Sequence, residues 1–254
     1  MLRFASLGSG SKGNATIIES EKTRVLLDCG FSVVETEKRL AQLDGSELSS
    51  IKAILVTHEH SDHVSGVGRL SRKYNLPVYM TFGTYQGCRD NRYTSIQYID
   101  PNKPFEIDGL HIQPFTVPHD AREPCQFVFS DGAARLGILT DTGSETPYII
   151  ETLQSLDALM LECNYDETML MQGSYPYKLK VRVAGNYGHL DNKQSSTLLK
   201  KLDQSKLKHL IGMHISEKNN RMEYANDALC EALGCEKEWM LLASQSGGFG
   251  WREI

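Results

Sequence analysis

Short apolar runs rich in β-branched residues alternate along the chain with longer stretches that repeat apolar positions at helical spacing. Bounded apolar runs indicate strands, and apolar residues recurring every three to four positions indicate amphipathic helices. Strands are expected at about 2–7, 14–20, 23–28, 51–56, 78–81, 95–99, 110–117, 124–130, 134–140, 158–162, 207–213 and 238–242. Helices are expected near 32–43, 63–74, 145–155, 191–203 and 220–233. This mixture predicts one domain over 1–254, of the α+β class, with two central sheets and helices outside.

The stretch 164–188 interrupts this regular alternation, being rich in tyrosine, glycine and basic residues, and is expected to run over the surface. Within it, the sequence YKLKVRV alternates in the manner of a strand. A strand would place three cations on one face: Lys178, Lys180 and Arg182. Such a strip would suit a phosphate backbone, and Tyr175, Tyr177 and Tyr187 would offer stacking surfaces. A solvated edge strand is the alternative interpretation.

Composition narrows the class of protein only slightly. The 254 residues are 40% hydrophobic and carry a formal charge of -5, so nucleic-acid binding by the whole surface is not expected, although a local basic strip is allowed. The sequence contains no apolar run of membrane-spanning length and no evident signal peptide. The six cysteines form no C-x-x-C pair. We therefore expect reduced cysteines and a cytoplasmic globular protein without a membrane partner.

The stretch SLGSGSKGN contains Gly8-x-Gly10-x-x-Gly13, followed by Asp28 at the spacing of a dinucleotide-binding fingerprint. That fingerprint requires a helix whose N-terminus receives the pyrophosphate. Here the flanking sequence predicts two strands, so a turn between strands is favoured over a site for NAD. The free amides and hydroxyls of such a turn can also contact an anion.

The segment THEHSDH carries the densest chemistry in the chain. His58 and His60 lie two positions apart at the end of an expected strand, so they point the same way and can bind one ion. Asp62 and His63 lie at the turn into the expected helix and can bind a second ion. A solvated charged turn is the alternative, but four potential ligands within six residues are rare outside metal sites.

This segment resembles the H-x-H-x-D-H signature of the metallo-β-lactamase fold, a family of metal-dependent hydrolases. The resemblance implies a four-layer αββα sandwich with two divalent metals at one edge of its sheets. It implies that the first metal is bound by His58, His60 and His119, the second by Asp62, His63 and His214, and both by Asp141. Imidazoles mixed with carboxylates suit zinc or manganese. Asp28 is expected to support the loop that carries the histidines.

Later motifs resemble those of the nuclease branches of this family, tRNase Z and the β-CASP enzymes. The first is an acidic residue at the end of a strand, matched by Glu162, and the second is a histidine in a G-H motif, matched by His189. The third is a histidine followed by a small hydroxyl residue, matched by His214 and Ser216. The chain most resembles the bacterial YycJ/WalJ group, which is regarded as DNA exonuclease-like. The stretches that carry this resemblance are LGSGSKGN, PYKLKVRV, GHLDN and MHISEKNN. PhnP-type phosphodiesterases are the nearest competitor, and a glyoxalase-II-like thioester hydrolase is a second reaction class.

The resemblance implies phosphodiester hydrolysis, with a 5′-to-3′ DNA exonuclease as the specific expectation and DNA favoured over RNA. His189, oriented by Glu162, is expected to protonate the leaving oxygen, and Asp62 to accept a proton from the nucleophile. The residues expected to contact substrate phosphates are Ser9, Ser11, Asn14, Lys178, Lys180, Arg182 and Ser216. For the turn at residues 8–14, a purely structural role is an equal alternative.

Overall fold

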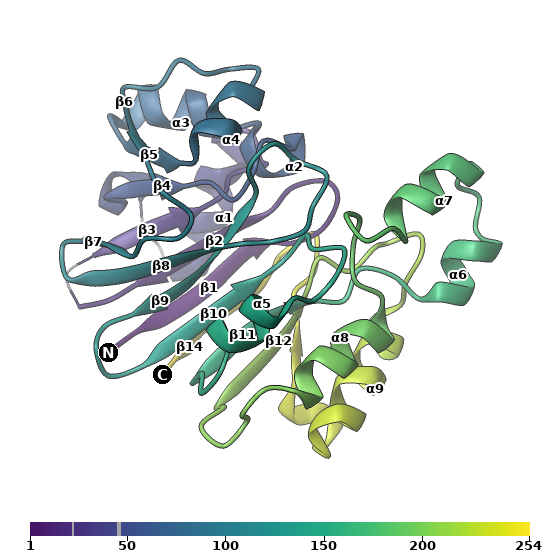
Figure 1. Ribbon diagram of the computed structural model, residues 1–254. Helices are drawn as coiled ribbons and strands as arrows, with labels where there is room; N and C mark the ends of the chain where they lie inside the picture. The colour runs from purple at the N-terminus through teal and green to yellow at the C-terminus, as the bar shows by residue number, and fades with distance from the viewer. Residues whose placement is uncertain (22, 45–46) are drawn as a thin grey trace.

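Two sheets pack face to face, and helices cover the outside of both, in the computed structural model shown in Figure 1. The structure describes residues 1–21, 23–44 and 47–254. Each sheet has seven strands among these residues. The expected four-layer αββα sandwich is therefore confirmed.

The first sheet runs in the order β14-β1-β2-β3-β4-β5-β6. Strands β14, β1, β2 and β3 are each antiparallel to the next. From β3 to β6 the strands are parallel. Its strands are β1 (Arg3–Gly8), β2 (Ala15–Glu19), β3 (Arg24–Leu27), β4 (Ala53–Leu55), β5 (Pro77–Met80), β6 (Ser95–Tyr98) and β14 (Phe249–Glu253).

The second sheet runs in the order β13-β12-β11-β10-β9-β8-β7. From β7 to β10 each strand is antiparallel to the next. From β10 to β13 each strand is parallel to the next. Its strands are β7 (Phe105–Ile107), β8 (Leu110–Thr116), β9 (Cys125–Ser130), β10 (Arg135–Leu139), β11 (Ala158–Glu162), β12 (His209–Met213) and β13 (Leu241–Leu242). The carboxyl ends of parallel strands meet at one edge, so each sheet can present loop residues to a shared site.

The helices are α1 (Val33–Asp44), α2 (Ser61–Val64), α3 (Val67–Tyr74), α4 (Phe82–Gly87), α5 (Pro147–Thr152), α6 (Glu167–Gln172), α7 (Tyr177–Val183), α8 (Asn192–Lys200) and α9 (Met222–Leu233). Two 3₁₀ turns lie at Leu48–Ser50 and Lys237–Trp239. None of the helices in the described ranges has the length and apolar character of a membrane span.

Three hydrophobic clusters explain the layers. Phe4, Phe127 and Phe129 belong to the core between the sheets, where side chains from both sheets meet. Leu40 and Leu70 belong to a second cluster that joins α1 and α3 to the first sheet. A third cluster joins α5, α8 and α9 to the second sheet. Burial of alternate strand faces against these layers stabilises the sandwich through removal of apolar surface from water.

The expectation of a strand at YKLKVRV is wrong. Residues 177–183 form helix α7, whose first residue follows Pro176 at the N-cap. Proline has a fixed φ and is compatible with the start of a helix. In a helix, Lys178 and Arg182 share a face because they are four positions apart, whereas Lys180 points elsewhere. The three cations therefore do not form a strip on one face.

The segment 164–188 does project from the sandwich, because α6 and α7 extend to one side of the sheets in Figure 1. No residue of α7 is buried. The single helix expected at 63–74 is two helices, α2 and α3, with Ser65 and Gly66 between them. Helices α4 and α6 and strands β7 and β14 were not expected at all.

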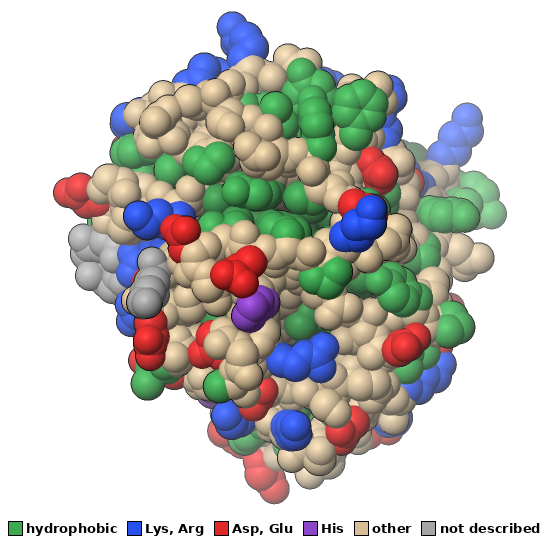
Figure 2. Space-filling view, turned by 60° about the vertical axis from the view of Figure 1, so that its left-hand side comes forward, with side chains coloured by type: hydrophobic (Ala, Val, Ile, Leu, Met, Phe, Trp, Pro, Cys, Tyr) green, Lys and Arg blue, Asp and Glu red, His purple; other side chains and the backbone are tan. Residues whose placement is uncertain are grey.

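Another side of the molecule, seen in Figure 2, carries hydrophobic side chains in a hollow across its middle. In Figure 2 the left-hand side of Figure 1, where β7 lies, faces the viewer. Near this edge the rings of Tyr79 and Phe105 stack, with centroids 5.6 Å apart. Ile99 and Phe105 are partly buried against the core between the sheets. These contacts close the sandwich at its β6 and β7 edges.

Candidate active site

Seven potential metal ligands converge at one edge of the sandwich. They lie in the segments that directly follow strands β4, β8, β10 and β12. The ligands are His58, His60, Asp62, His63, His119, Asp141 and His214. Residues separated by more than 150 positions in the sequence thus share one site. The structure brings together every metal ligand expected from the sequence.

One group consists of three imidazoles: His58, His60 and His119, whose ligand atoms all lie within 4.8 Å of one another. The Nε2 atom of His119 is 3.2 Å from Nδ1 of His60. Three imidazoles at this spacing match the donor set of a catalytic transition-metal site.

A second group contains Asp62, His63 and His214. The Oδ2 atom of Asp62 lies 3.5 Å from His63 Nε2 and 3.6 Å from His214 Nε2. Asp141 contacts this second group, because Oδ2 is 3.0 Å from His63 Nε2 and Oδ1 is 2.8 Å from His214 Nδ1. The same carboxylate also belongs to a set with His58. That position suits a carboxylate shared by two ions.

Two ring nitrogens at this site are buried without a hydrogen bond to the described residues. They are Nε2 of His58 and Nε2 of His214. A buried polar atom that lacks a partner is costly, and most such atoms in folded proteins have one. Divalent cations would supply the missing partners of both atoms. The residues present therefore fit a metal centre in chemistry as well as in spacing.

The charges at the site also favour cations. Burial and the imidazole of His63 hold the pKa of His58 well below its usual value, so this ring is in the neutral form that binds metals. Burial opposes charge on His214, but the Asp141 carboxylate outweighs it and raises the pKa of His214 well above its usual value, so a cation bound at His214 would displace a proton from the ring. Burial likewise opposes charge on Asp141, yet His214 and His63 hold the pKa of that carboxyl well below its usual range. Asp141 therefore remains a carboxylate available to a cation.

Three residues of the site adopt left-handed backbone conformations that non-glycine residues rarely take. Their φ angles are +58° for Asp28, +49° for Asp141 and +52° for His214. Such conformations carry a cost of order 1–3 kcal/mol and cluster at functional sites. Here they turn the chain sharply at the strand ends, so that the side chains face the centre.

Asp28 supports the motif loop, as expected from the sequence. Its carboxylate accepts hydrogen bonds from the backbone N–H and the hydroxyl of Thr57, both at 2.9 Å. Its Oδ2 atom is also 2.8 Å from Nδ1 of His63. Because a carboxylate only accepts, the proton of His63 lies on Nδ1 and Nε2 is free for a cation.

Two further groups orient imidazoles, and the sequence analysis did not single them out. The hydroxyl of Thr57 is 2.9 Å from Nδ1 of His58. The carbonyl of Gly188 accepts from Nδ1 of His119 at 3.0 Å, which leaves Nε2 of that ring facing the centre. Their positions directly before His58 and His189 are the only sequence signal for either role.

The turn between β1 and β2 contacts the ligand loops. Ser9 Oγ accepts a hydrogen bond from the backbone N–H of His214 at 2.8 Å. Asn14 Nδ2 donates to Asp62 Oδ2 at 3.3 Å. Ser9 and Asn14 are buried, whereas Ser11 is exposed and lines the cavity above the centre. Ser216 is buried, and its hydroxyl accepts from the N–H of Asn219.

Glu162 and His189 form a second unit beside the ligands. Glu162 is fully buried, and its Oε1 lies 2.7 Å from Nδ1 of His189. Its Oε2 accepts from the backbone N–H groups of Thr142 and Leu190, at 3.0 and 3.3 Å. Burial would lower the pKa of His189, but the Glu162 carboxylate outweighs this effect and raises it. The unit can therefore hold a proton at the edge of the centre.

A cavity of about 840 Å³ opens over these residues. His60, Asp62, Asp141, His189 and His214 line its base. The wall formed by α7 and the residues before it contributes Tyr175, Leu179, Arg182 and Val183. The opposite wall comes from the segment that contains α2 and α3 and from the end of α4 with the residues after it. Its residues include Ser61, Ser65, Arg69, Gly87, Arg89 and Asp90.

Of the three cations expected to form a strip, only Arg182 is among the residues that line this cavity. Its guanidinium pairs with the carboxylate of Asp120. Lys180 donates instead to the backbone carbonyl of Met171, at 2.6 Å. Lys178 is exposed. The structure therefore separates these side chains rather than bringing them together.

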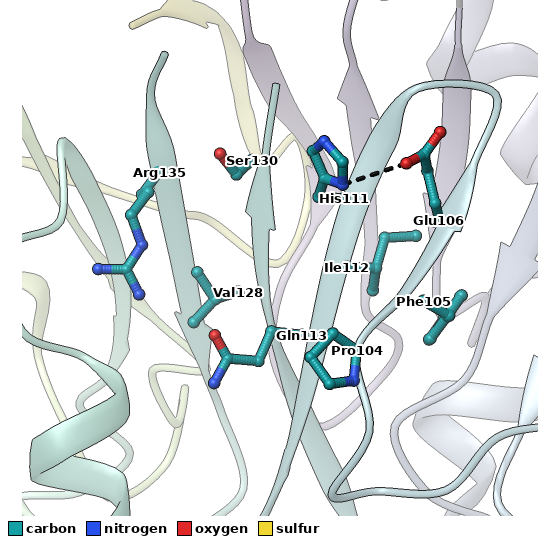
Figure 3. Close-up of a pocket in the computed structure, with 9 residues that line it drawn as sticks. All are labelled: Pro104, Phe105, Glu106, His111, Ile112, Gln113, Val128, Ser130 and Arg135. Atoms are coloured by element: carbon teal, nitrogen blue, oxygen red, sulfur yellow. Dashed lines mark ion pairs between the residues drawn. The ribbon is translucent and has the colours of Figure 1, made fainter. Parts of the chain in front are cut away.

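A smaller hollow of about 390 Å³ lies against β7, β8, β9 and β10, and its lining is drawn in Figure 3. His111 Nδ1 is 3.2 Å from Glu106 Oε2 there. Arg135 donates to the carbonyls of Gln154 and Thr152. The charged groups of this hollow already have partners, so the larger cavity is the better candidate for chemistry.

The comparisons with known proteins agree with this geometry. Residues 23–215 match the family model described as a beta-lactamase superfamily domain. The chain is 32% identical over 236 residues to exodeoxyribonuclease YycJ of Bacillus anthracis, covering 91% of this chain and 89% of that protein. It is 31% identical over 237 residues to exodeoxyribonuclease WalJ of Streptococcus pneumoniae, covering 91% and 88%.

Among solved structures, the metallo-beta-lactamase fold protein YhfI from Bacillus subtilis superposes with a TM-score of 0.76. The alignment covers 100% of both chains at 17% identity, so it supports the fold alone. Family model, relatives and architecture agree with one another. The chain belongs to the beta-lactamase superfamily and is a metal-dependent hydrolase of the metallo-β-lactamase fold.

Proposed function

We propose that this protein is a dinuclear-metal-dependent phosphodiesterase that degrades nucleic acid, acting as a 5′-to-3′ exonuclease on DNA. The observation that carries the proposal is the position of the Glu162–His189 pair beside the seven clustered ligands, at the base of an open cavity. YycJ of Bacillus anthracis and WalJ of Streptococcus pneumoniae, which match most of the chain, are themselves named exodeoxyribonucleases. The six unpaired cysteines agree with a cytoplasmic location.

In this proposal one cation is held by His58, His60 and His119 and the other by Asp62, His63 and His214, with Asp141 shared. Zinc and manganese both suit these donors. Two such ions supply, when bound, Lewis-acid activation of an attacking water and neutralisation of charge on the phosphate. The remaining chemistry belongs to side chains of the protein.

His189 delivers a proton to the leaving oxygen of the phosphodiester. Its side chain is 21% exposed at the base of the cavity, so its ring can reach a bound phosphate. Glu162 fixes the ring through Nδ1, which leaves Nε2 to carry the transferred proton. The same carboxylate favours the protonated imidazole, the form that a general acid requires.

Asp62 accepts the proton of the attacking water. Its carboxylate lies near His63 and His214, and Asn14 donates a hydrogen bond to it. Burial would raise the pKa of Asp62, but the imidazoles of His63 and His214 lower it. Ser9, Asn14 and the buried Ser216 position the loops of the centre in this account, and Ser11 and Arg182, which line the cavity, contact substrate.

The test is hydrolysis of end-labelled single- and double-stranded DNA and RNA by the purified protein with Mn²⁺ or Zn²⁺. We expect labelled mononucleotides to appear at the start of the reaction with 5′-labelled DNA, and RNA to be degraded more slowly. Samples treated with chelator provide the control. Hydrolysis of a small phosphodiester without degradation of any polymer would favour a PhnP-like function. Hydrolysis of a thioester alone would overturn the proposal.

A further inference from the structure

Three arginines line the cavity, and they differ in whether their charge is already paired. Arg182 on the α7 wall pairs with Asp120. Arg69 of α3 and Arg89, which follows α4, line the opposite wall and are both exposed. Within residues 1–21, 23–44 and 47–254, the guanidinium groups of Arg69 and Arg89 have no hydrogen bond or ion pair. Their charges are therefore available to a ligand.

Two acidic residues of the cavity lining lie near these arginines, and neither pairs with their guanidinium groups. Glu59, which lies against Gly87, accepts the backbone N–H of Arg122 at 2.9 Å. Asp90 also lines the cavity, but both its carboxylate oxygens accept from Arg72, at 3.1 and 2.8 Å. Arg92 approaches the same carboxylate at 3.3 Å. The hydrogen bonds from Arg72 hold the pKa of Asp90 at about 2. Asp90 thus carries its full charge at neutral pH and shares it with two other arginines.

The α3 wall also leads away from the metal centre. Ser61, Ser65 and Arg69 follow one another at four-residue spacing, and all three line the cavity. Ser65 and Gly66 separate α2 from α3 but keep right-handed helical φ and ψ, so the chain continues along the same wall. Arg69 is seven positions beyond Asp62, a path of at most about 10 Å at the rise of an α-helix. A DNA strand advances roughly 3.4 Å per nucleotide, so this path spans about three nucleotides.

We propose that Arg69 and Arg89 bind backbone phosphates of the nucleic acid strand that extends from the scissile linkage along the α3 wall. This inference rests on the proposed function and adds to it the path of the polymer across the protein. A guanidinium presents two parallel N–H groups to a phosphate and stays charged at any pH that the fold tolerates. The path replaces the α7 strip expected from the sequence, whose cations lie apart from one another.

The inference is tested by replacing both arginines and measuring DNA binding by fluorescence anisotropy at several salt concentrations. The ligand is a short single-stranded oligonucleotide with phosphorothioate linkages, which keep the charge and slow cleavage. Each lost phosphate contact should reduce the slope of log affinity against log salt by about 0.7. Arg69→Gln combined with Arg89→Gln should therefore reduce the slope by about 1.4.

The matched control is Lys38→Gln combined with Lys52→Gln. Both lysines are exposed and absent from the cavity lining, and the change in net charge is the same. This control should keep the wild-type slope. Arg69→Lys with Arg89→Lys provides a second variant, because it keeps both charges and should also keep the slope while weakening affinity through loss of bidentate geometry.

The outcomes separate this inference from the proposed function. A wild-type slope in the glutamine variant, or an equal decrease in the lysine control, overturns the role of Arg69 and Arg89 even if the wild-type protein degrades DNA. Failure of the proposed function appears earlier, as a wild-type protein that hydrolyses no DNA. If the glutamine variant does not fold, a reduced slope in the Arg→Lys variant, which keeps both charges, would count against the inference.

Discussion

The Nδ1 atom of His189 lies 2.7 Å from Oε1 of Glu162, a carboxylate that is fully buried beneath the metal ligands. The other oxygen of Glu162 accepts two backbone N–H groups, so the carboxylate cannot turn away from the imidazole. This arrangement fixes the direction in which His189 presents Nε2. Glu162 and His189 also lie close enough to Asp141 and His214 to hold a cation with them, so the metal content of a His189 variant separates the two roles.

His189→Ala should retain its metal and slow hydrolysis of DNA by about 10²–10⁴-fold, the usual contribution of a general acid. The loss should shrink for a nitrophenyl phosphodiester, because a good leaving group needs little protonation. Rates on both substrates and metal content by elemental analysis test this prediction. His111→Ala is the control, since His111 is exposed and pairs with Glu106 far from the metal ligands. A loss of metal together with activity would make His189 a ligand instead.

Glu162→Gln should destabilise the protein by about 1–3 kcal/mol, the cost of an unsatisfied buried polar group. The amide nitrogen would face either Nδ1 of His189 or two backbone N–H groups, and all of these are donors. Denaturant unfolding measures the change. Glu167→Gln, an exposed residue five positions later, should change stability by less than about 0.5 kcal/mol. Equal effects of the two substitutions would contradict this account of Glu162.

Asp28→Asn should weaken metal affinity by about 10–100-fold, the range typical of groups that orient metal ligands. The asparagine amide would donate to Nδ1 of His63 and so move the ring proton to Nε2, where the cation binds. Asparagine tolerates the positive φ of this position, so the backbone should persist. Competition with a coloured chelator measures the affinity. Asp108→Asn, an exposed aspartate that also has positive φ, should leave affinity unchanged.

Gly30→Ala should destabilise the loops that carry the site by at least about 1–3 kcal/mol, the usual cost of overpacking. A Cβ atom at Gly30 would lie 1.9 Å from the carbonyl oxygen of Asp62 and 2.8 Å from Cα of Gly13. Both contacts are with backbone, which cannot rotate aside. Thermal unfolding compares this variant with Gly250→Ala, whose Cβ would meet no atom within 4 Å. Equal melting temperatures for the two variants would contradict the prediction.

The sequence predicted most of the sandwich because its strands are short apolar runs with clear boundaries. The motif from His58 to His63 was also found directly, since its ligands lie next to one another in the chain. His119, Asp141 and His214 lie at the ends of separate strands, so only the family resemblance pointed to them. Contacts such as Ser9 with His214 depend on the folding of distant segments and have no local sequence signal.

Helix α7 shows where the pattern misled. Its residues alternate between basic and apolar, which is typical of a strand, and the helix has no buried face to impose a helical period. Its conformation follows instead from Pro176 at its start and from local contacts such as Lys180 with Met171. Arg69 and Arg89 were not found from the sequence, because unpaired charge is a property of the folded surface.

The central claim is that metal ions held by the seven clustered ligands carry out phosphodiester hydrolysis. The most direct test measures DNA hydrolysis and metal content in the same sample, before chelation, after chelation and after metal is restored. We predict about two transition-metal ions per chain, loss of hydrolysis with the metal and recovery when Mn²⁺ or Zn²⁺ is returned. Full DNA hydrolysis by protein shown to contain no metal would contradict the account.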